Sequence, residues 1–196
     1  NWTTCELDKI YTADYYYVKF FDSDNGVIVC GYAKSNDTNE SSRIYSTSNG
    51  GESWDIVGSG PATNIIKGVV YVSSDVGFFC YDYVEGMDSN LYKTDDGGKT
   101  FAKVMLEEQE LDSSAANPQG QETETKTDSG KNGADSSEQL RWGDVYKEAL
   151  TPVVDSTGII TIYLTQGKNA VYNDGKTAAK YQSSDKGSTW KYIGQV

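Results

Sequence analysis

The stretch Thr94-Asp95-Asp96-Gly97-Gly98-Lys99-Thr100-Phe101 decides the fold of this chain, because its pattern occurs three times. The other copies are Thr47-Ser48-Asn49-Gly50-Gly51-Glu52-Ser53-Trp54 and Ser183-Ser184-Asp185-Lys186-Gly187-Ser188-Thr189-Trp190. All three fit [S/T]-x-[D/N]-x-G-x-[S/T]-[W/F], and each follows an Ile-Tyr, Leu-Tyr or Lys-Tyr strand ending. Three copies of one turn within 196 residues predict a repeat architecture.

The chemistry of the pattern is that of a self-contained hairpin turn. The carboxylate or amide at the third position can accept hydrogen bonds from backbone N–H groups of its own turn. The fixed glycine suits a backbone position with positive φ, where a side chain would be strained. The final aromatic residue opens the next strand and can pack beneath the hairpin. The residues predicted to have these structural roles are the acceptors Asn49, Asp96 and Asp185, the glycines Gly51, Gly98 and Gly187, and the aromatics Trp54, Phe101 and Trp190.

In this form the motif resembles the Asp-box, or bacterial neuraminidase repeat (BNR), of sialidases, sortilin-type receptors and photosystem II assembly factors. The first copy departs from the family preference, because Asn49 keeps an acceptor but lacks the charge. The resemblance implies a sialidase-like β-propeller, whose box turns lie at the blade periphery and serve structure rather than catalysis. It also implies an extracellular or cell-surface location, since such repeats mostly occur in secreted or lumenal proteins.

The repeat extends upstream of each turn. In the second unit, residues 69–72 and 78–81 are β-branched and aromatic runs on either side of a glycine turn, and the other units follow the same plan. Adding the strands that flank the box gives four strands per unit, which is typical of a propeller blade. We therefore expect an all-β fold in one domain, residues 1–196. Its blade units are residues 11–60, 64–106 and 148–196, and residues 1–10, marked by Trp2, are a strand of an incomplete blade.

Residues 107–140 interrupt the repeat. This segment carries nine acidic residues against two lysines, no aromatic residues and almost no aliphatic ones. A segment of this composition cannot bury enough apolar surface to offset the entropy of ordering. We expect a disordered acidic insertion, and a hidden fourth blade is the competing interpretation.

The number of blades raises the question of ring closure. Propellers close with four to eight blades, whereas this chain supplies about three blades and an N-terminal strand. Three arrangements stay open at this point: partial closure completed by neighbouring blades of a longer chain, closure shared by a homodimer, and an unusual compact variant.

Composition narrows the classes of partner. The formal net charge of −12 argues against nucleic acid or an anionic membrane surface as a partner. No apolar run approaches the roughly 18 residues that a membrane helix requires, so membrane insertion is not expected. Of the three cysteines, Cys30 and Cys80 are expected to be buried thiols, and a Cys5–Cys30 pair is the disulfide to test first.

Catalytic constellations are scarce in the sequence. The chain has no histidine, which removes Ser-His-Asp and Cys-His systems and histidine metal sites. Sialidases clamp the sugar carboxylate with three arginines, and only Arg43 and Arg141 are present. The segment Asp22-Ser23-Asp24-Asn25-Gly26 fails the spacing of a calcium loop. We predict no catalytic residue, metal or cofactor, although 29 acidic residues leave a two-carboxylate glycosidase possible in composition.

The expected function is a non-catalytic binding or scaffold module for a protein or glycan ligand. The alternative is a carbohydrate-active domain, either a glycan-binding module or a fragment of a glycoside hydrolase. Exposed aromatic side chains on propeller loops commonly bind ligands, so Trp142 and Tyr172 are the candidate ligand surface. The competing interpretation is that these two side chains fill gaps in the core. For Tyr15-Tyr16-Tyr17, alternate side chains are expected to face a core between blades.

Overall fold

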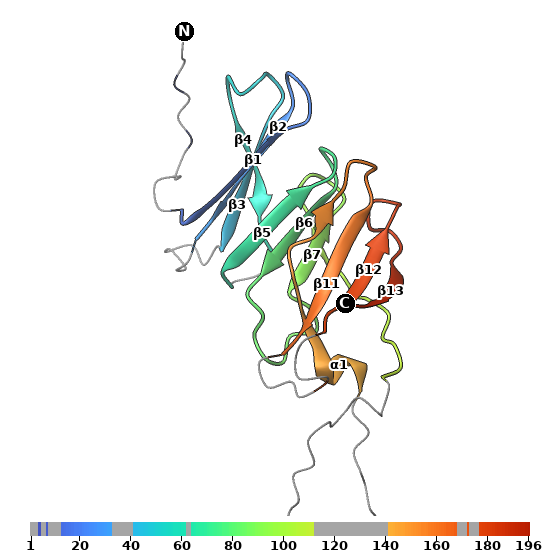
Figure 1. The fold of residues 1–196 in the computed structure, drawn as a ribbon. Coiled ribbons are helices and arrows are strands. Elements are labelled where there is room, and N and C mark those ends of the chain that lie inside the picture. The colour runs from blue at the N-terminus through green and yellow to red at the C-terminus, as the bar shows by residue number, and fades with distance from the viewer. Residues whose placement is uncertain are drawn as a thin grey trace, which may run out of the picture.

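The fold consists of three antiparallel sheets that follow one another along the chain (Figure 1). The computed structural model describes residues 13–32, 41–61, 64–111, 141–167 and 177–196, together with the single positions 4, 7 and 172. The first sheet contains β1 (Tyr15–Phe20), β2 (Gly26–Gly31), β3 (Ser42–Thr47) and β4 (Asp55–Ser59). The second contains β5 (Ile66–Tyr71), β6 (Gly77–Tyr81), β7 (Leu91–Thr94) and β8 (Ala102–Lys103). The third follows α1 (Trp142–Val145) and contains β9 (Tyr146–Ala149), β10 (Val153–Val154), β11 (Ile160–Gln166), β12 (Ala179–Ser183) and β13 (Lys191–Gln195).

Each sheet contains a four-stranded meander in which neighbouring strands are also consecutive in sequence. The orders are β1-β2-β3-β4, β5-β6-β7-β8 and β10-β11-β12-β13. Neighbouring strands in every sheet are antiparallel. This arrangement is that of a propeller-type four-stranded blade. The expected all-β class of four-stranded blades is therefore confirmed.

The third sheet departs from the expected unit at its first strand. β9 pairs with the end of β11, and β10 pairs with its beginning, so both lie along one strand. Pro152 stands between them and has no N–H to donate to the sheet. The sheet thus begins at Tyr146 rather than within residues 148–196, and it holds a broken first strand instead of an unbroken one.

Two apolar cores join the three sheets face to face. The core between the first and second sheets contains Val29 and Ile44 on one side and Tyr71 and Phe79 on the other, all fully buried. The core between the second and third sheets contains Phe78, Leu91, Ile160 and Ile162 among its members. Because side chains alternate along a strand, Phe78 and Phe79 reach the two different cores from neighbouring positions. The second sheet is therefore covered on both faces.

Side chains of β1 satisfy the free edge of β5. The hydroxyl oxygens of Tyr15 and Tyr17 accept hydrogen bonds from the backbone N–H groups of Val69 and Tyr71, each at 3.1 Å. The Lys19 ammonium donates to the backbone oxygen of Tyr71 at 2.5 Å. Edge strands leave such backbone groups unpaired, and here the neighbouring sheet supplies their partners. The expected inward orientation of alternate tyrosines is confirmed.

Some expectations fall on residues that lie outside the described part of the chain. These are the strand over residues 1–10 with Trp2, of which only positions 4 and 7 are described, and residues 112–140 of the expected insertion. Residues 107–111, at the start of that segment, form no helix or strand. Cys30 and Cys80 are free, buried thiols, so Cys30 is not paired with Cys5, which itself lies outside the described residues.

Candidate functional site

The carboxylate of Asp96 closes its own turn. Its Oδ1 accepts hydrogen bonds from the backbone N–H groups of Lys99 and Thr100 at 3.0 and 2.8 Å, and from the Thr94 hydroxyl at 2.9 Å. Its Oδ2 accepts from the Thr100 hydroxyl at 2.6 Å. These bonds, led by those from Thr100, hold the pKa of Asp96 well below its ordinary value. The carboxylate is therefore committed to the turn.

The third copy repeats this geometry. Oδ1 of Asp185 accepts from the backbone N–H groups of Ser188 and Thr189 at 3.1 and 2.9 Å, and from the Ser183 hydroxyl at 2.7 Å. The Thr189 hydroxyl donates to Oδ2 at 2.7 Å. Hydrogen bonds from Thr189 and Ser183 likewise lower the pKa of the Asp185 carboxyl below its ordinary value.

The first copy keeps the turn with an amide. Oδ1 of Asn49 accepts from the Thr47 hydroxyl at 2.8 Å and from the backbone N–H of Ser53 at 3.0 Å. The Asn49 amide nitrogen donates to the Ser53 hydroxyl at 2.9 Å. The asparagine thus replaces the acceptor without the charge, as the sequence predicted.

The box aromatics pack beneath their hairpins, each edge-to-face against a phenylalanine. The ring centroids of Phe101 and Phe79 are 4.9 Å apart, and those of Trp190 and Phe78 are 6.0 Å apart. Trp54 lies 5.9 Å from Phe20 in the same way. Such pairs add to the stabilisation that burial gives.

The box glycines have positive φ, and so does the position before them. The φ angles of Gly51, Gly98 and Gly187 are 88°, 109° and 76°. Sequence reasoning missed the preceding position, which holds glycine in two copies but Lys186, with φ of 57°, in the third. Lys186 is the only non-glycine residue with positive φ among the described residues.

Replacing Lys186 with glycine is expected to stabilise the protein. A left-handed backbone costs a non-glycine residue about 1–2 kcal/mol, and part of that gain is lost because glycine makes the unfolded chain more flexible. The net gain in the free energy of unfolding is about 0.5–1 kcal/mol, measured by urea denaturation. Lys186→Ala is the control, because alanine keeps the strain, and an equal gain in both variants would contradict this explanation.

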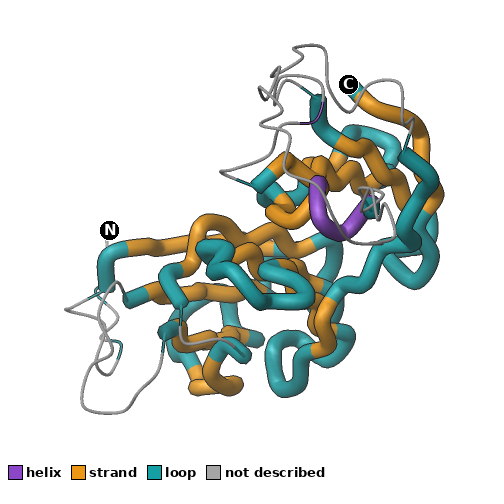
Figure 2. The backbone as a smooth tube through the Cα atoms, turned by 90° about the horizontal axis from the view of Figure 1, so that it is seen from below, coloured by secondary structure: helices purple, strands orange, loops and turns teal. Residues whose placement is uncertain are grey.

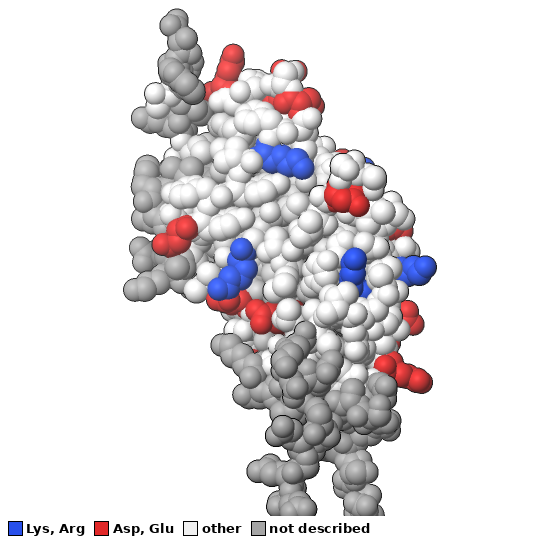
Figure 3. Space-filling model, in the orientation of Figure 1, with Lys and Arg blue, Asp and Glu red and all other residues white. Residues whose placement is uncertain are grey.

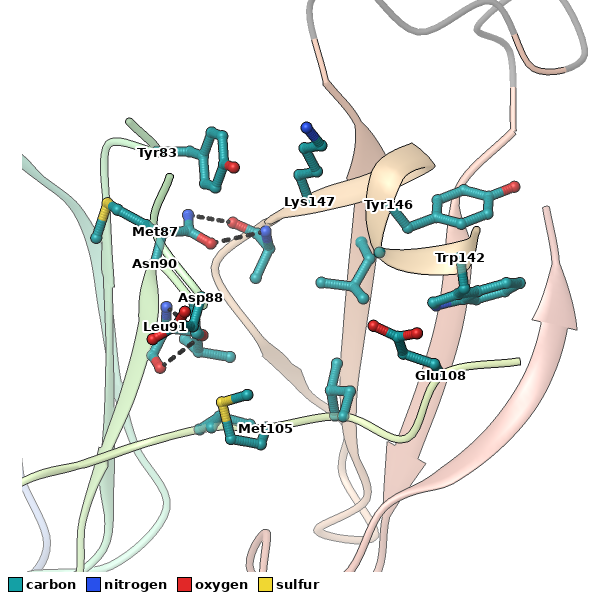
Figure 4. Close-up of a pocket in the computed structure, with 16 residues that line it drawn as sticks. Tyr83, Met87, Asp88, Asn90, Leu91, Met105, Glu108, Trp142, Tyr146 and Lys147 are labelled. Atoms are coloured by element: carbon teal, nitrogen blue, oxygen red, sulfur yellow. Dashed lines mark hydrogen bonds between the residues drawn. The ribbon is translucent and has the colours of Figure 1, made fainter. Parts of the chain in front are cut away.

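A cleft of about 300 Å³ lies between the second and third sheets, beside α1 (Figure 4). Met87, Asp88 and Asn90 lie on one side, and Trp142 and Glu108 lie on the other (Figure 4). The cleft is assembled from the loop between β6 and β7, the segment after β8, and α1 with β9. Apolar side chains and polar groups share its lining, and its carboxylates come from both sides. The remaining lining residues are Tyr83, Ser89, Leu91, Val104, Met105, Leu106, Gly143, Tyr146, Lys147, Ala149 and Leu164.

Asn90 holds the two walls of the cleft together. Its amide nitrogen donates to the backbone oxygens of Tyr81 and Ala149 at 2.8 and 2.9 Å, and its oxygen accepts from the Ala149 N–H at 2.8 Å. The Asn90 side chain is fully buried. The end of β9 is therefore tied to the second sheet through one side chain.

The charged groups of the cleft differ in their partners. Asp88 pairs with Lys103 at 2.6 Å, and Lys147 pairs with Glu85 at 2.7 Å. Glu108 forms no ion pair with another residue of the described chain, and its carboxylate lies beside Trp142 in the cleft (Figure 4). Across the face shown in Figure 3, the described charges are scattered and of both signs.

The expectation that Trp142 and Tyr172 form an exposed ligand surface is wrong. Trp142 is 4% exposed and Tyr172 is 1% exposed. The Trp142 ring packs against Tyr146 and Tyr192 at centroid distances of 4.5 and 5.4 Å, and Tyr146 also contacts Tyr172. Both rings are therefore packed in the apolar cluster beside α1, and only part of the Trp142 ring lines the cleft.

Burial keeps two thiols and one tyrosine hydroxyl of the described chain in their protonated, unreactive forms at neutral pH. Burial raises the pKa of the Cys30 thiol to about 11 and that of the Cys80 thiol to about 12. The thiolate is the reactive form, so both thiols are inert at neutral pH. Burial also raises the pKa of the Tyr81 hydroxyl to about 12.

Clusters of metal ligands and membrane-spanning helices are both absent from the described part of the chain. Within it, no group of three or more cysteine, aspartate or glutamate side chains is placed to hold a metal ion. No helix among the described residues is long and apolar enough to span a membrane.

Comparisons with known proteins give only distant likenesses. No protein-family model matches the sequence, and no curated protein matches it. Among solved structures, the chain is similar to the GH74 enzyme of Niastella koreensis, with 16% identity and a TM-score of 0.44. That alignment covers 86% of this chain and 19% of the enzyme, so this chain spans about a fifth of the enzyme's length. It is also similar to YCF48 bound to a D1 peptide, with 15% identity, a TM-score of 0.34 and coverage of 97% and 70%.

Proposed function

We propose that this chain is a non-catalytic binding or scaffold module that takes a segment of a partner protein in the cleft between its second and third sheets. The observation that carries this proposal is the lining of the cleft, where Met87, Met105 and Leu106 lie with the carboxylates of Asp88 and Glu108. Methionine side chains adapt to apolar ligands of different shapes. The ligand that fits is an extended segment with an apolar side chain next to a lysine or arginine.

Two observations support binding rather than catalysis. The most conspicuous carboxylates of the sequence, Asp96 and Asp185, are used by their own turns. The thiols of Cys30 and Cys80 are buried and protonated at neutral pH. The cleft, in contrast, is open enough that Met105 is 64% exposed.

A random-peptide library selected on the immobilised protein tests the proposal. We expect selected peptides to contain an apolar residue beside a basic one, and to lose most of their affinity for Met105→Glu. Val153→Glu is the matched control, because Val153 is also exposed but lies outside the cleft. Failure to select any peptide, or equal binding by both variants, would overturn the proposal.

A carbohydrate-active domain is the second candidate, because Asp88 and Glu108 line the same cleft. A glycan array tests it, with Glu108→Gln as the variant. Trp142→Ala is a poor variant, since the ring is buried and its loss would disturb packing. Retention of a glycan by the protein, lost in Glu108→Gln, would favour this candidate over a peptide ligand.

The proposed location is extracellular or at the cell surface, and it rests on the resemblance of the box turns. The net charge of −12 supports protein or glycan, rather than nucleic acid, as the partner. Protease treatment of intact cells that make the full protein tests the location, because a surface protein is degraded and an internal one survives.

A further inference from the structure

Glu108 differs from the other charged groups of the cleft in having no partner of opposite charge within the described chain. Asp88, on the opposite wall, pairs with Lys103 at 2.6 Å. The Lys147 ammonium pairs with Glu85 at 2.7 Å. The Glu108 side chain points into the cleft instead (Figure 4). The charge of this carboxylate is therefore free to meet a ligand.

Gly143 leaves the room that this carboxylate occupies. A Cβ on Gly143 would lie 2.6 Å from Oε1 of Glu108, which is closer than two such atoms approach in proteins. The φ of Gly143 is not positive, so the backbone itself does not require a glycine there. The glycine instead gives the carboxylate its place beside α1, which lies at one end of the third sheet (Figures 1 and 2).

The segment that carries Glu108 is anchored to both sheets that form the cleft. The Val104 N–H donates a hydrogen bond to the backbone oxygen of Leu91, on β7, at 2.9 Å. The Tyr181 hydroxyl, on β12, donates to the backbone oxygen of Glu107 at 2.7 Å. A carboxylate on an anchored segment loses less conformational freedom on binding than one on a free loop.

The ligand group that matches this carboxylate best is a guanidinium. Its planar fork can donate two parallel hydrogen bonds to one carboxylate, whereas an ammonium meets it as a point charge. A guanidinium is also more weakly hydrated and stacks on aromatic rings. Part of the Trp142 ring lines the cleft beside Glu108 (Figure 4). Arginine therefore fits this position better than lysine.

From these observations we infer that Glu108 is the specificity-determining residue of the cleft and that it selects an arginine in the partner segment. Gly143 is a positioning residue, because it acts through the place that it gives to the carboxylate. The apolar side chain next to the arginine then lies toward Met87 and Leu91, on the side of the second sheet. This inference rests on the proposed function and narrows the basic residue of its ligand to arginine.

Titration with three synthetic peptides, followed by NMR at the indole N–H of Trp142, tests this inference. The peptides are Gly-Ser-Leu-Arg-Ser-Gly and its variants with lysine or citrulline, the uncharged analogue of arginine, in place of arginine. We expect the lysine peptide to bind about threefold to tenfold more weakly than the arginine peptide, and the citrulline peptide to bind more weakly still. Glu108→Gln should lose most of the preference for arginine.

Two variants separate the local site from the general charge of the cleft. Asp88→Asn removes one negative charge from the opposite wall and should keep the preference for arginine. Gly143→Ala keeps the net charge but displaces the Glu108 carboxylate, so it should lower the preference about as much as Glu108→Gln does. Combining the two changes should cause no further loss, because both act on the same group. Melting curves confirm that the variants fold.

The outcomes distinguish this inference from the proposed function. Equal affinity for the arginine and lysine peptides, or a preference that survives Glu108→Gln, would overturn the inference. Equal weakening of the arginine peptide by Asp88→Asn and Glu108→Gln would also overturn it, because overall charge would then select the ligand. In each of these cases, binding that Met105→Glu abolishes would leave the proposed function in place. If the native protein binds none of the peptides, both are overturned.

Discussion

Replacing Asn90 with alanine is expected to lower the free energy of unfolding by about 3 kcal/mol. The substitution leaves the buried carbonyl of Tyr81 and the N–H of Ala149 without the partner they have now. The Ala149 carbonyl keeps a weaker bond from the Cys80 thiol, 3.1 Å away. Each unsatisfied buried group costs about 1–3 kcal/mol, so two groups account for the expected loss. Urea denaturation at neutral pH measures it as a fall in the midpoint.

Asn64→Ala is the matched control for this prediction. The Asn64 amide donates to the Asp82 carbonyl and to the Met87 sulfur, both at 3.3 Å, and the residue is only partly buried. Water can replace such bonds, so the expected loss is below about 1 kcal/mol. An equal loss in the free energy of unfolding for both variants would contradict the stabilising role of the buried hydrogen bonds between Asn90 and β9.

Gly98→Ala is expected to destabilise the protein by about 2–4 kcal/mol, from backbone strain and from overpacking. The φ of Gly98 is 109°, a region that L-residues rarely adopt. A Cβ there would lie 2.9 Å from Cδ1 of Ile44 and 3.1 Å from the hydroxyl oxygen of Tyr71. Ile44 belongs to the first sheet, so this box turn seals the core between two sheets. Thermal or urea denaturation measures the loss.

Gly86→Ala separates the two causes. Gly86 has a similar φ of 92°, but a Cβ there would meet nothing within 4 Å. This variant reports strain alone, about 1–2 kcal/mol. We expect the loss in Gly98→Ala to be larger, and a loss no greater than that of Gly86→Ala would contradict the packing role of the turn.

The repeated turns could be predicted because their chemistry is local. The acceptor, the glycine and the aromatic of each copy lie within eight residues, so their hydrogen bonds do not depend on the rest of the fold. The alternation of Tyr15 and Tyr17 could be predicted for the same reason, since strand geometry fixes which side chains share a face. The positive φ of Lys186 could not be predicted, because the repeated pattern allows any residue at that position. The other two copies hold glycine there.

The cleft could not be predicted from the sequence. Met87, Met105 and Trp142 come from three segments that are distant in the chain, and only the packing of the second sheet on the third brings them together. The burial of Trp142 and Tyr172 was missed for a related reason. A helix of four residues leaves no periodic pattern, so nothing in the sequence indicated which side of α1 would be covered.

The pH dependence of stability follows from the two box carboxylates. The pKa values of Asp96 and Asp185 are lower in the folded protein than in the unfolded chain, where an aspartate has a pKa of about 3.9. Their contribution to stability is therefore complete above that value and is lost as the pH falls toward the folded pKa. We expect unfolding to become easier as the pH falls below about 4, at which the unfolded aspartates begin to bind protons.

The central claim is that the repeated carboxylates are structural parts of the sheet turns. Titration of the Asp96 and Asp185 carboxyl carbons by NMR tests it most directly. We predict that both carboxylates remain ionised at about pH 3.9, where an ordinary aspartate is half protonated. A titration midpoint of either residue at or above that pH would contradict the claim, because it would mean that the carboxylate is not held by the N–H and hydroxyl groups of its turn.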